Sequence, residues 1–360
     1  MYVMPTLLPY FRWWPRRVRC TLQPRRQAIH AGLRPGGCAR RRPDRKKPLF
    51  HFYPGSRAFS VATVGCNLRC AFCQNWQIAE WPRSHLGKRI VGQANAGART
   101  SEASLDLTQD MIPGDLLTPH QIVERTQRSG CASIAYTYTE PTIFYELAYD
   151  TAALARAKGL KNVFVTNGFT SEAPLREIAP LIDAVNVDLK AFKEETYRRV
   201  SRSRLGPVLD AIRLYRSLGV WVEVTTLVIP GLNDSDQELQ SIAEFICSVG
   251  VEVPWHVSRF HPAYQMSEIP PTPVATLRRA FQLGKASGLR YVYIGNVAGA
   301  EGEDTRCFNC LASLIERVGF TIRKNRIIKG SCPDCDATID GVGMTRSEFR
   351  GSPGAARLSS

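Results

Sequence analysis

The 360-residue sequence lacks a long apolar run, and no stretch approaches the roughly 20 apolar residues that a membrane-spanning helix needs. No membrane span is therefore expected. Acidic side chains are nearly missing from residues 1–47, which hold 13 Lys and Arg but only Asp44, for a net charge of +12. The other 313 residues keep only +3 of the total of +15, so the body is almost neutral. We do not expect nucleic acid as the main partner, although a basic arm can bind it.

The N-terminal segment, residues 1–50, also lacks helical or strand periodicity, and residues 1–47 contain no serine. An Arg-rich, acid-poor segment is typical of an organellar presequence, but the missing serine argues against that interpretation. We interpret residues 1–50 as a basic, poorly ordered arm. Its two cysteines, Cys20 and Cys38, are too few for a four-ligand metal site.

Cysteines are present in two groups that indicate metal binding. Cys66, Cys70 and Cys73 are spaced C-x3-C-x2-C, and three thiols so close together cannot easily be paired as disulfides. All three can reach one cubane iron–sulfur cluster, and three ligands instead of the usual four leave one iron open for chemistry. Phe72 offers an apolar side chain to stack on a bound ligand. A structural metal knuckle is the alternative.

Two CxxC pairs near the C-terminus form the second group. Cys307 and Cys310 are separated from Cys332 and Cys335 by 21 residues, and four thiolates at this spacing predict a structural zinc site within a ribbon-like module, residues 301–343. A second iron–sulfur cluster is the competing interpretation. Metal-binding cysteines indicate a reducing compartment, so a cytoplasmic location is expected. The tail, residues 344–360, is expected to be disordered.

Strand-like runs alternate with helical segments across residues 51–300, which predicts an α/β fold with a parallel sheet. A barrel, complete or partial, and an open doubly wound sheet both fit this periodicity. Residues 81–114 are weakly patterned and are interpreted as a surface insertion. The expected strands are residues 59–64, 133–137, 162–166, 184–189, 221–229, 255–258 and 291–294. The expected helices are residues 118–130, 143–158, 172–181, 208–218, 235–249 (capped by Asp234) and 274–286.

Polar residues follow each predicted strand, and in α/β barrels the active site lies at the carboxyl ends of the strands. The strongest candidates there are Thr139, Glu140, Asn167, Asp188 and Lys190. Each has a purely structural alternative. Glu140 can be a carboxylate at a helix N-terminus, Asn167 a turn residue, and Asp188 with Lys190 a plain ion pair.

The cysteine loop and its flanks resemble a known family. The motif G-C-N-L-R-C-A-F-C-Q-N-W over residues 65–76 is similar to the signature of the radical S-adenosylmethionine (SAM) superfamily. Together with F-Y-P-G-S-R over residues 52–57, it resembles the AmmeMemoRadiSam-system radical SAM enzymes, relatives of the pyruvate formate-lyase activating enzymes. The resemblance implies a partial (β/α)6 TIM-like barrel. It also implies a [4Fe–4S] cluster whose open iron is chelated by the amino acid end of SAM.

The resemblance also implies roles for the strand-end residues. Thr139 and Glu140 occupy the place of the family's glycine-rich segment that holds the SAM amino group, although both glycines of that segment are replaced here. Asn167 and Asp188 are expected to meet the ribose or the carboxylate, and Lys190 the carboxylate. Asp188 with Thr166 is also implied in holding a cation.

The implied reaction is reductive cleavage of SAM to a 5′-deoxyadenosyl radical that abstracts hydrogen from an unknown substrate. It requires an external one-electron donor of the flavodoxin or ferredoxin kind. Memo-like and AMMECR-like proteins are implied as partners by association. Activation of a glycyl radical enzyme is one alternative function. A zinc-ribbon protein that binds nucleic acid is an alternative from a different class.

Overall fold

The computed structural model describes residues 28–30, 48–84, 114–297 and 302–345. Most of the expected basic arm and surface insertion, and the tail from residue 346, lie outside these residues. None of the described helices is long and apolar enough to cross a membrane.

Seven parallel strands form the central sheet, and their order along the sheet is their order along the chain. An open doubly wound sheet reverses its strand order at a switch point, so the unbroken order excludes that alternative. In the described part of the chain the two edge strands do not pair with each other, which confirms a partial barrel. The strands are β2 (Ala58–Val61), β4 (Ser133–Tyr136), β5 (Lys161–Thr166), β6 (Ala184–Asp188), β7 (Trp221–Val228), β8 (Trp255–Arg259) and β9 (Val292–Gly295).

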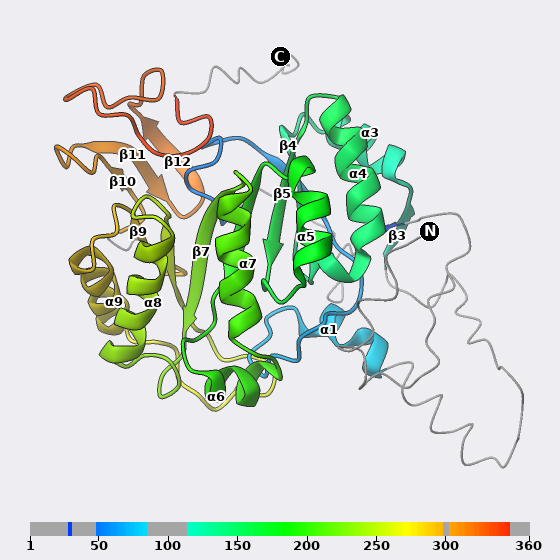
Figure 1. Cartoon of the computed structure of the whole chain (residues 1–360), viewed down its shortest axis with the longest axis horizontal. Helices are drawn as coiled ribbons and strands as arrows, with labels where there is room; N and C mark the ends of the chain where they lie inside the picture. The colour runs from blue at the N-terminus through cyan, green and yellow to red at the C-terminus, as the bar shows by residue number, and fades with distance from the viewer. Residues whose placement is uncertain (1–27, 31–47, 85–113, 298–301, 346–360) are drawn as a thin grey trace, which may run out of the picture.

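A helix links each strand to the next and lies on the outer face of the sheet (Figure 1). These helices are α3 (Pro119–Arg128), α4 (Tyr145–Ala157), α5 (Glu172–Ile178), α7 (Gly206–Ser217), α8 (Asp236–Val249) and α9 (Val274–Ala286). The shorter elements are α1 (Trp76–Ala79), α6 (Glu194–Thr196), the 3-10 turns η2 (Pro141–Phe144) and η3 (Ala179–Leu181), and the π-helical turn η4 (Tyr197–Ser201).

Local sequence signals place most of these elements within a few residues. A capping box begins α3, because Thr118 and Gln121 exchange hydrogen bonds between side chain and backbone. The predicted cap of α8 is wrong. Ser235 accepts the hydrogen bond from the Glu238 amide, whereas the Asp234 carboxylate accepts from the Gly231 amide in the preceding turn.

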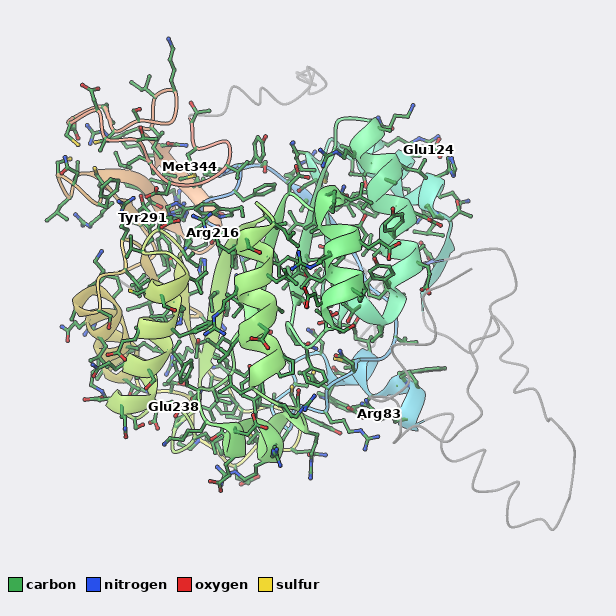
Figure 2. The ribbon with its side chains drawn as sticks, in the orientation of Figure 1. Arg83, Glu124, Arg216, Glu238, Tyr291 and Met344 are labelled. Atoms are coloured by element: carbon green, nitrogen blue, oxygen red, sulfur yellow. The ribbon has the colours of Figure 1, made fainter. Side chains whose placement is uncertain are left out.

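A small antiparallel sheet of β10 (Thr305–Arg306), β11 (Ser313–Val318) and β12 (Thr321–Asn325) forms the C-terminal module. This module lies at the opposite end of the barrel from α1 and α6 (Figure 1). Its core is shared with the barrel, because buried Tyr291 packs in the same apolar cluster as Met344 (Figure 2). The disordered tail was expected to begin at residue 344, but Met344 belongs to the folded module. Met344 is 4% exposed, and burying its apolar side chain keeps it in the fold.

The basic arm was expected to be poorly ordered over residues 1–50. Its two described parts, residues 28–30 and 48–50, correct this expectation. Residues Ala28–His30 form β1, which pairs antiparallel with β3 (Asp115–Leu117). Leu49 is 5% exposed and packs in an apolar cluster with Phe52 beneath the sheet. Apolar burial thus makes residues 48–50 part of the folded body.

One buried carboxylate organises the amino-terminal end of the barrel. Glu223 of β7 accepts hydrogen bonds from the amides of Phe50 and His51, at 2.9 and 2.8 Å, and from Trp221 Nε1 at 3.1 Å. His256 Nε2 lies 2.6 Å from the same carboxylate. Burial alone would raise the pKa of Glu223, but these partners, His256 first, hold it below its ordinary value. The segment before β2 is thereby fixed to β7 and β8.

A directed chain of hydrogen bonds joins this end to the C-terminal module. His51 Nδ1 lies 2.6 Å from the Asp340 carbonyl oxygen, which can only accept, so Nδ1 carries the proton of the neutral ring. Nε2 then accepts from the Tyr293 hydroxyl at 2.5 Å. That hydroxyl accepts from Thr305, which accepts from Arg317 Nη1 at 2.6 Å. The chain is complete only while His51 stays neutral.

We expect mild acid to destabilise the fold through His51. Burial lowers the pKa of His51 from 6.5 to about 4, so between these values the unfolded chain binds a proton that the folded chain excludes. Stability therefore rises with pH through this window by at most roughly 1.4 kcal/mol per pH unit, and His51 adds no further loss below about pH 4. His51→Gln, which cannot take the proton, should flatten this dependence in urea unfolding at about pH 5.5 and about pH 7.5.

His120→Gln is the matched control, since His120 is exposed on α3 and should leave the pH dependence of wild type unchanged. Equal losses of stability in wild type and His51→Gln between the two pH values would contradict the prediction.

Candidate cluster and cofactor sites

The three clustered cysteines lie on one loop between β2 and α1, at the carboxyl edge of the sheet. Backbone hydrogen bonds fix this loop from two sides. The amides of Arg69 and Ala71 donate to the carbonyls of Ser201 and Val200 in η4, at 3.1 and 2.9 Å, and the Gln265 amide donates to the Ala71 carbonyl at 3.0 Å. The loop is therefore held in shape by the protein itself, before any metal binds.

Two further residues shape the start of the loop. Gly65 has a φ of +100°, and a Cβ there would lie 3.3 Å from the side chains of Ile143 and Pro82, so glycine is required. Arg83 Nη2 donates to the Cys66 carbonyl at 2.8 Å, while Nη1 pairs with Glu80 at 2.6 Å. Figure 2 shows Arg83 at this end of the molecule, near α1. Sequence analysis missed Arg83, because no local motif links it to a loop 17 residues earlier.

The thiols fit a metal cluster by their chemistry. All three are free, and burial raises the pKa of Cys66 to about 12 and that of Cys73 to about 11. Burial also raises the pKa of Cys70. Without a metal these groups therefore stay protonated at neutral pH, and bound iron would supply the positive charge that stabilises their thiolates.

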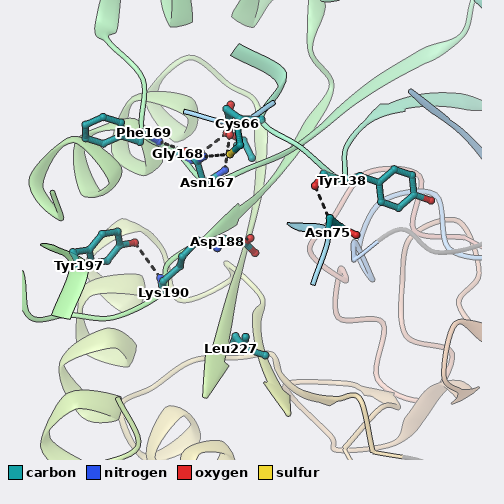
Figure 3. Close-up of polar contacts among 12 residues, drawn as sticks. Cys66, Asn75, Tyr138, Asn167, Gly168, Phe169, Asp188, Lys190, Tyr197 and Leu227 are labelled. Atoms are coloured by element: carbon teal, nitrogen blue, oxygen red, sulfur yellow. Dashed lines mark hydrogen bonds and ion pairs between the residues drawn. The ribbon is translucent and has the colours of Figure 1, made fainter. Parts of the chain in front are cut away.

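An amide pair connects the cysteine loop to the end of β5. Asn167 Nδ2 donates to Asn67 Oδ1 at 2.7 Å and lies 3.8 Å from Cys66 Sγ, and Asn167 Oδ1 accepts from the Phe169 amide (Figure 3). Asn67 Nδ2 donates to the Phe169 carbonyl at 2.8 Å. The predicted residue Asn167 is thus beside the first cysteine, with a partner, Asn67, that sequence analysis did not single out.

Glu140 is buried between the ends of β4 and β5, with 1% of its side chain exposed. Its carboxylate accepts from the amides of Thr142 and Asn167, at 3.1 and 2.8 Å, and from the hydroxyls of Thr142 and Thr166. Burial raises its pKa, although these four donors oppose the shift. Neighbouring Thr139 donates to the Thr63 carbonyl at 2.9 Å. The carboxylate therefore joins the strand ends to one another.

Asp188 is the last residue of β6, and Lys190, two residues later, forms an ion pair of 3.0 Å with it. Lys190 Nζ also lies 5.5 Å from the centre of the Phe72 ring, within cation–π range, so these predicted residues are brought together. Burial alone would lower the pKa of Lys190, yet the Asp188 carboxylate and then the Cys70 sulfur raise it. The Lys190 amide donates to the Tyr197 hydroxyl at 3.0 Å (Figure 3). A fixed cation thus lies beside the cysteine loop.

A cavity of about 480 Å³ opens next to the same loop. It lies at the carboxyl ends of β7, β8 and β9, which is where α/β barrels bind substrates. Its lining residues are Gln74, Leu227, Arg259, His261 and Asn296. Gln74 directly follows Cys73, so the loop that carries the cysteines also forms part of the cavity wall.

The C-terminal cysteines converge on one point. The four sulfurs lie within 4.8 Å of one another, and the pairs Cys307–Cys335 and Cys310–Cys332 are each 3.6 Å apart. A tetrahedral zinc ion with Zn–S distances of about 2.3 Å separates its sulfurs by about 3.8 Å. This spacing fits one zinc ion, whereas a cubane cluster holds its thiolates farther apart. The ligand set is closed, which indicates a structural role.

Comparisons with known proteins agree with this architecture. The model of the Radical SAM superfamily matches residues 60–246. Uncharacterized protein MJ0808 of Methanocaldococcus jannaschii is 41% identical over 328 residues, which cover 85% of this chain and 90% of that protein.

More distant relatives have named activities. Benzylsuccinate synthase activating enzyme of Thauera aromatica is 23% identical over 69% of this chain and 80% of its own length. Pyruvate formate-lyase 1-activating enzyme of Escherichia coli K12 is 22% identical over 60% of this chain and 80% of its own. A solved radical SAM methyltransferase from Sphaerobacter thermophilus has a TM-score of 0.47 at 18% identity, covering 70% of this chain and 71% of that one.

Metal analysis of the full chain should find about one zinc ion per molecule at the C-terminal site. Cys332→Ala should abolish zinc binding and lower the unfolding temperature, because Cys332 is buried in the core shared by the module and the barrel. Cys247→Ala is the control, since Cys247 lies on α8, outside this site. Zinc retained in Cys332→Ala, or iron at this site in wild type, would contradict the prediction.

Proposed function

The chain belongs to the radical SAM superfamily, and from this premise we propose that Cys66, Cys70 and Cys73 ligate its [4Fe–4S] cluster. One observation carries the proposal: three free thiols lie on one prebuilt loop at the carboxyl edge of the barrel. The family implies SAM as the second cofactor, bound at the iron that lacks a cysteine ligand.

The residues around the cysteine loop support a SAM pocket, and each of them has a distinct role in binding SAM. Lys190, held by Asp188 and Tyr197, offers a fixed cation for the SAM carboxylate. Asp188 is 38% exposed in its side chain and is available to a ribose hydroxyl. Phe72 is almost fully buried beside Lys190, so it shapes the apolar wall of the pocket.

Glu140, Thr139 and Asn167 have their own hydrogen-bonding partners in the protein. We therefore assign Glu140 a positioning role, in which it holds the β4 and β5 ends in register with the cysteine loop, rather than direct contact with SAM. Asn167 has the same role toward Asn67 and the first cysteine. Thr139 leaves its backbone as the group available to the SAM amino group.

When bound and reduced, the cluster supplies the electron that cleaves SAM to yield the 5′-deoxyadenosyl radical for hydrogen abstraction. The protein's part is to bind, orient and exclude water. This activity needs an external one-electron donor of the flavodoxin or ferredoxin kind. The nine described cysteines are all free, which supports a reducing compartment such as the cytoplasm.

The substrate class distinguishes two versions of this function. The resemblance of residues 52–57 and 65–76 supports an AmmeMemoRadiSam-system enzyme, with Memo-like and AMMECR-like proteins as partners. The relatives named as activating enzymes support instead the activation of a glycyl radical enzyme. A nucleic-acid-binding ribbon finds less support, because the C-terminal module packs against the barrel through Tyr291 and Tyr293.

The cluster assignment is tested by anaerobic iron and sulfide analysis with EPR of the reduced protein. Wild type should give a cluster signal that added SAM perturbs, because SAM binds the open iron. Cys70→Ala should lose the signal, because two remaining thiolates cannot hold a cubane. Cys131→Ala is the matched control, since Cys131 is a buried cysteine at the start of β4. A protein that binds only zinc after reconstitution would refute the proposal.

The positioning role of Glu140 predicts a separable defect. Glu140→Gln places an amide NH2 against N–H and O–H donors, which costs roughly 1–3 kcal/mol of stability. The shifted strand ends should weaken SAM binding about tenfold while the cluster signal persists. Equilibrium dialysis with labelled SAM measures the affinity, with exposed Glu146→Gln of α4 as the control. Unchanged SAM affinity in Glu140→Gln would contradict the positioning role of Glu140.

A further inference from the structure

One charged side chain, that of Arg259, lines the cavity beside the cysteine loop, and part of its hydrogen-bonding capacity is unused among the described residues. Arg259, the last residue of β8, donates from Nε to the Thr272 carbonyl at 2.8 Å. Thr272 is itself fixed, because its hydroxyl donates to the Val228 carbonyl and accepts from the Phe260 amide. The guanidinium is therefore anchored at one edge and held in one orientation at the cavity wall.

The two Nη groups of Arg259 form the free edge of this guanidinium. Among the described residues no carboxylate lies within ion-pair distance of Arg259, and its Nη atoms make no hydrogen bond there. The other lining residues carry no acidic side chain either. A planar pair of N–H donors in this setting is the geometry that binds carboxylate or phosphate oxygens bidentately.

The remaining cavity wall is divided between polar and apolar groups. Gln74 Nε2 and His261 are linked, since the amide donates to the His261 carbonyl at 3.1 Å. Asn296 Nδ2 donates to Ser258 and to the Arg259 carbonyl, so the Asn296 side chain is also fixed. Leu227 packs in the same apolar cluster as Phe72 of the cysteine loop. Leu227 therefore joins the cavity wall to the apolar surroundings of the cysteine loop.

Lys190 and Arg259 are two separate cations. Lys190 follows β6, forms an ion pair with Asp188 and lies against Phe72, whereas Arg259 ends β8, two strands farther along the sheet. A single SAM carboxylate needs only one of these two cations. The other cation is available to a second anionic molecule.

We propose that this cavity binds the substrate, and that the substrate carries an oxyanion group, carboxylate or phosphate, held by the free edge of Arg259. The inference rests on the proposed radical SAM function for its placement beside the cluster. It assigns to that function a substrate class, a small anionic molecule or an anionic group on a larger one.

The test uses the full chain, reconstituted and saturated with SAM, with inorganic phosphate and acetate as separate probes. Titration calorimetry gives the affinity of each probe, and the probe that binds more tightly identifies the oxyanion class. The relaxation of the phosphate 31P signal, compared between oxidised and reduced protein, reports whether the bound ion lies near the paramagnetic cluster.

Arg259→Gln should weaken binding of the preferred probe about tenfold, as expected for loss of a charge-assisted hydrogen-bonded pair. Its affinity for SAM should stay within about twofold of wild type. Asn296→Asp, at an exposed position on the cavity rim, should also weaken probe binding, because it adds a negative charge and removes the donor to the Arg259 carbonyl. Arg323→Gln is the control, because it removes the same charge at an exposed position on β12 of the C-terminal module.

Each outcome decides the assignment. A tenfold loss of SAM affinity in Arg259→Gln would overturn it, because Arg259 would then hold the SAM carboxylate. Equal probe binding in wild type, Arg259→Gln and Asn296→Asp would also overturn it. Probe binding that depends on Arg259 in a protein that forms no cluster would support the anion site while refuting the proposed function.

Discussion

A carboxylate buried in a protein must be surrounded by donors, since leaving it unpaired costs several kcal/mol. Two such carboxylates control the ends of this barrel. Glu223 at the amino-terminal end gathers two backbone amides, an indole and a histidine. Glu140 at the carboxyl end gathers two amides and two hydroxyls from the ends of β4 and β5. The Glu223 donors come from segments far apart in the chain, whereas Glu140 joins its own turn to the end of the neighbouring strand β5.

The two ends of the barrel consequently have different roles. At the amino-terminal end, the Glu223 contacts and the hydrogen-bond chain through His51 attach the C-terminal module, whose Cys307 and Cys332 lie in the same core as Tyr291. At the carboxyl end, Glu140, Asn167 and Arg83 hold a loop of free thiols in shape. Because the sheet is continuous between these ends, stability and chemistry occupy separate regions, as is usual for α/β barrels.

Sequence periodicity predicted the alternation of strands and helices, since each element buries an apolar face of regular spacing. The spacing of the C-terminal CxxC pairs predicted that their four sulfurs converge, because each pair brings two thiols together within one turn. The contacts of Glu223 with Phe50 and His51 span more than 170 residues and have no sequence signature. Arg83, Asn67 and Arg259 were missed for the same reason, since their roles depend on which carbonyls and amides the fold brings to them. The cap of α8 was misplaced by one residue because Asp234 and Ser235 are both good caps.

The cavity and the cluster site share the cysteine loop, and this has a consequence for how the enzyme selects substrates. Gln74 touches the cavity and is adjacent to Cys73, while Phe72 on the other side of Cys73 faces Lys190. A molecule anchored at Arg259 is therefore positioned against the same rigid loop that would position the cofactor. Hydrogen abstraction depends on placing two reacting groups within contact distance, and a cavity wall formed partly by the cysteine loop brings a molecule anchored on β8 close to that loop. The geometry thus favours anionic substrates in which the anchored group and the reacting carbon are separated by about the width of the cavity.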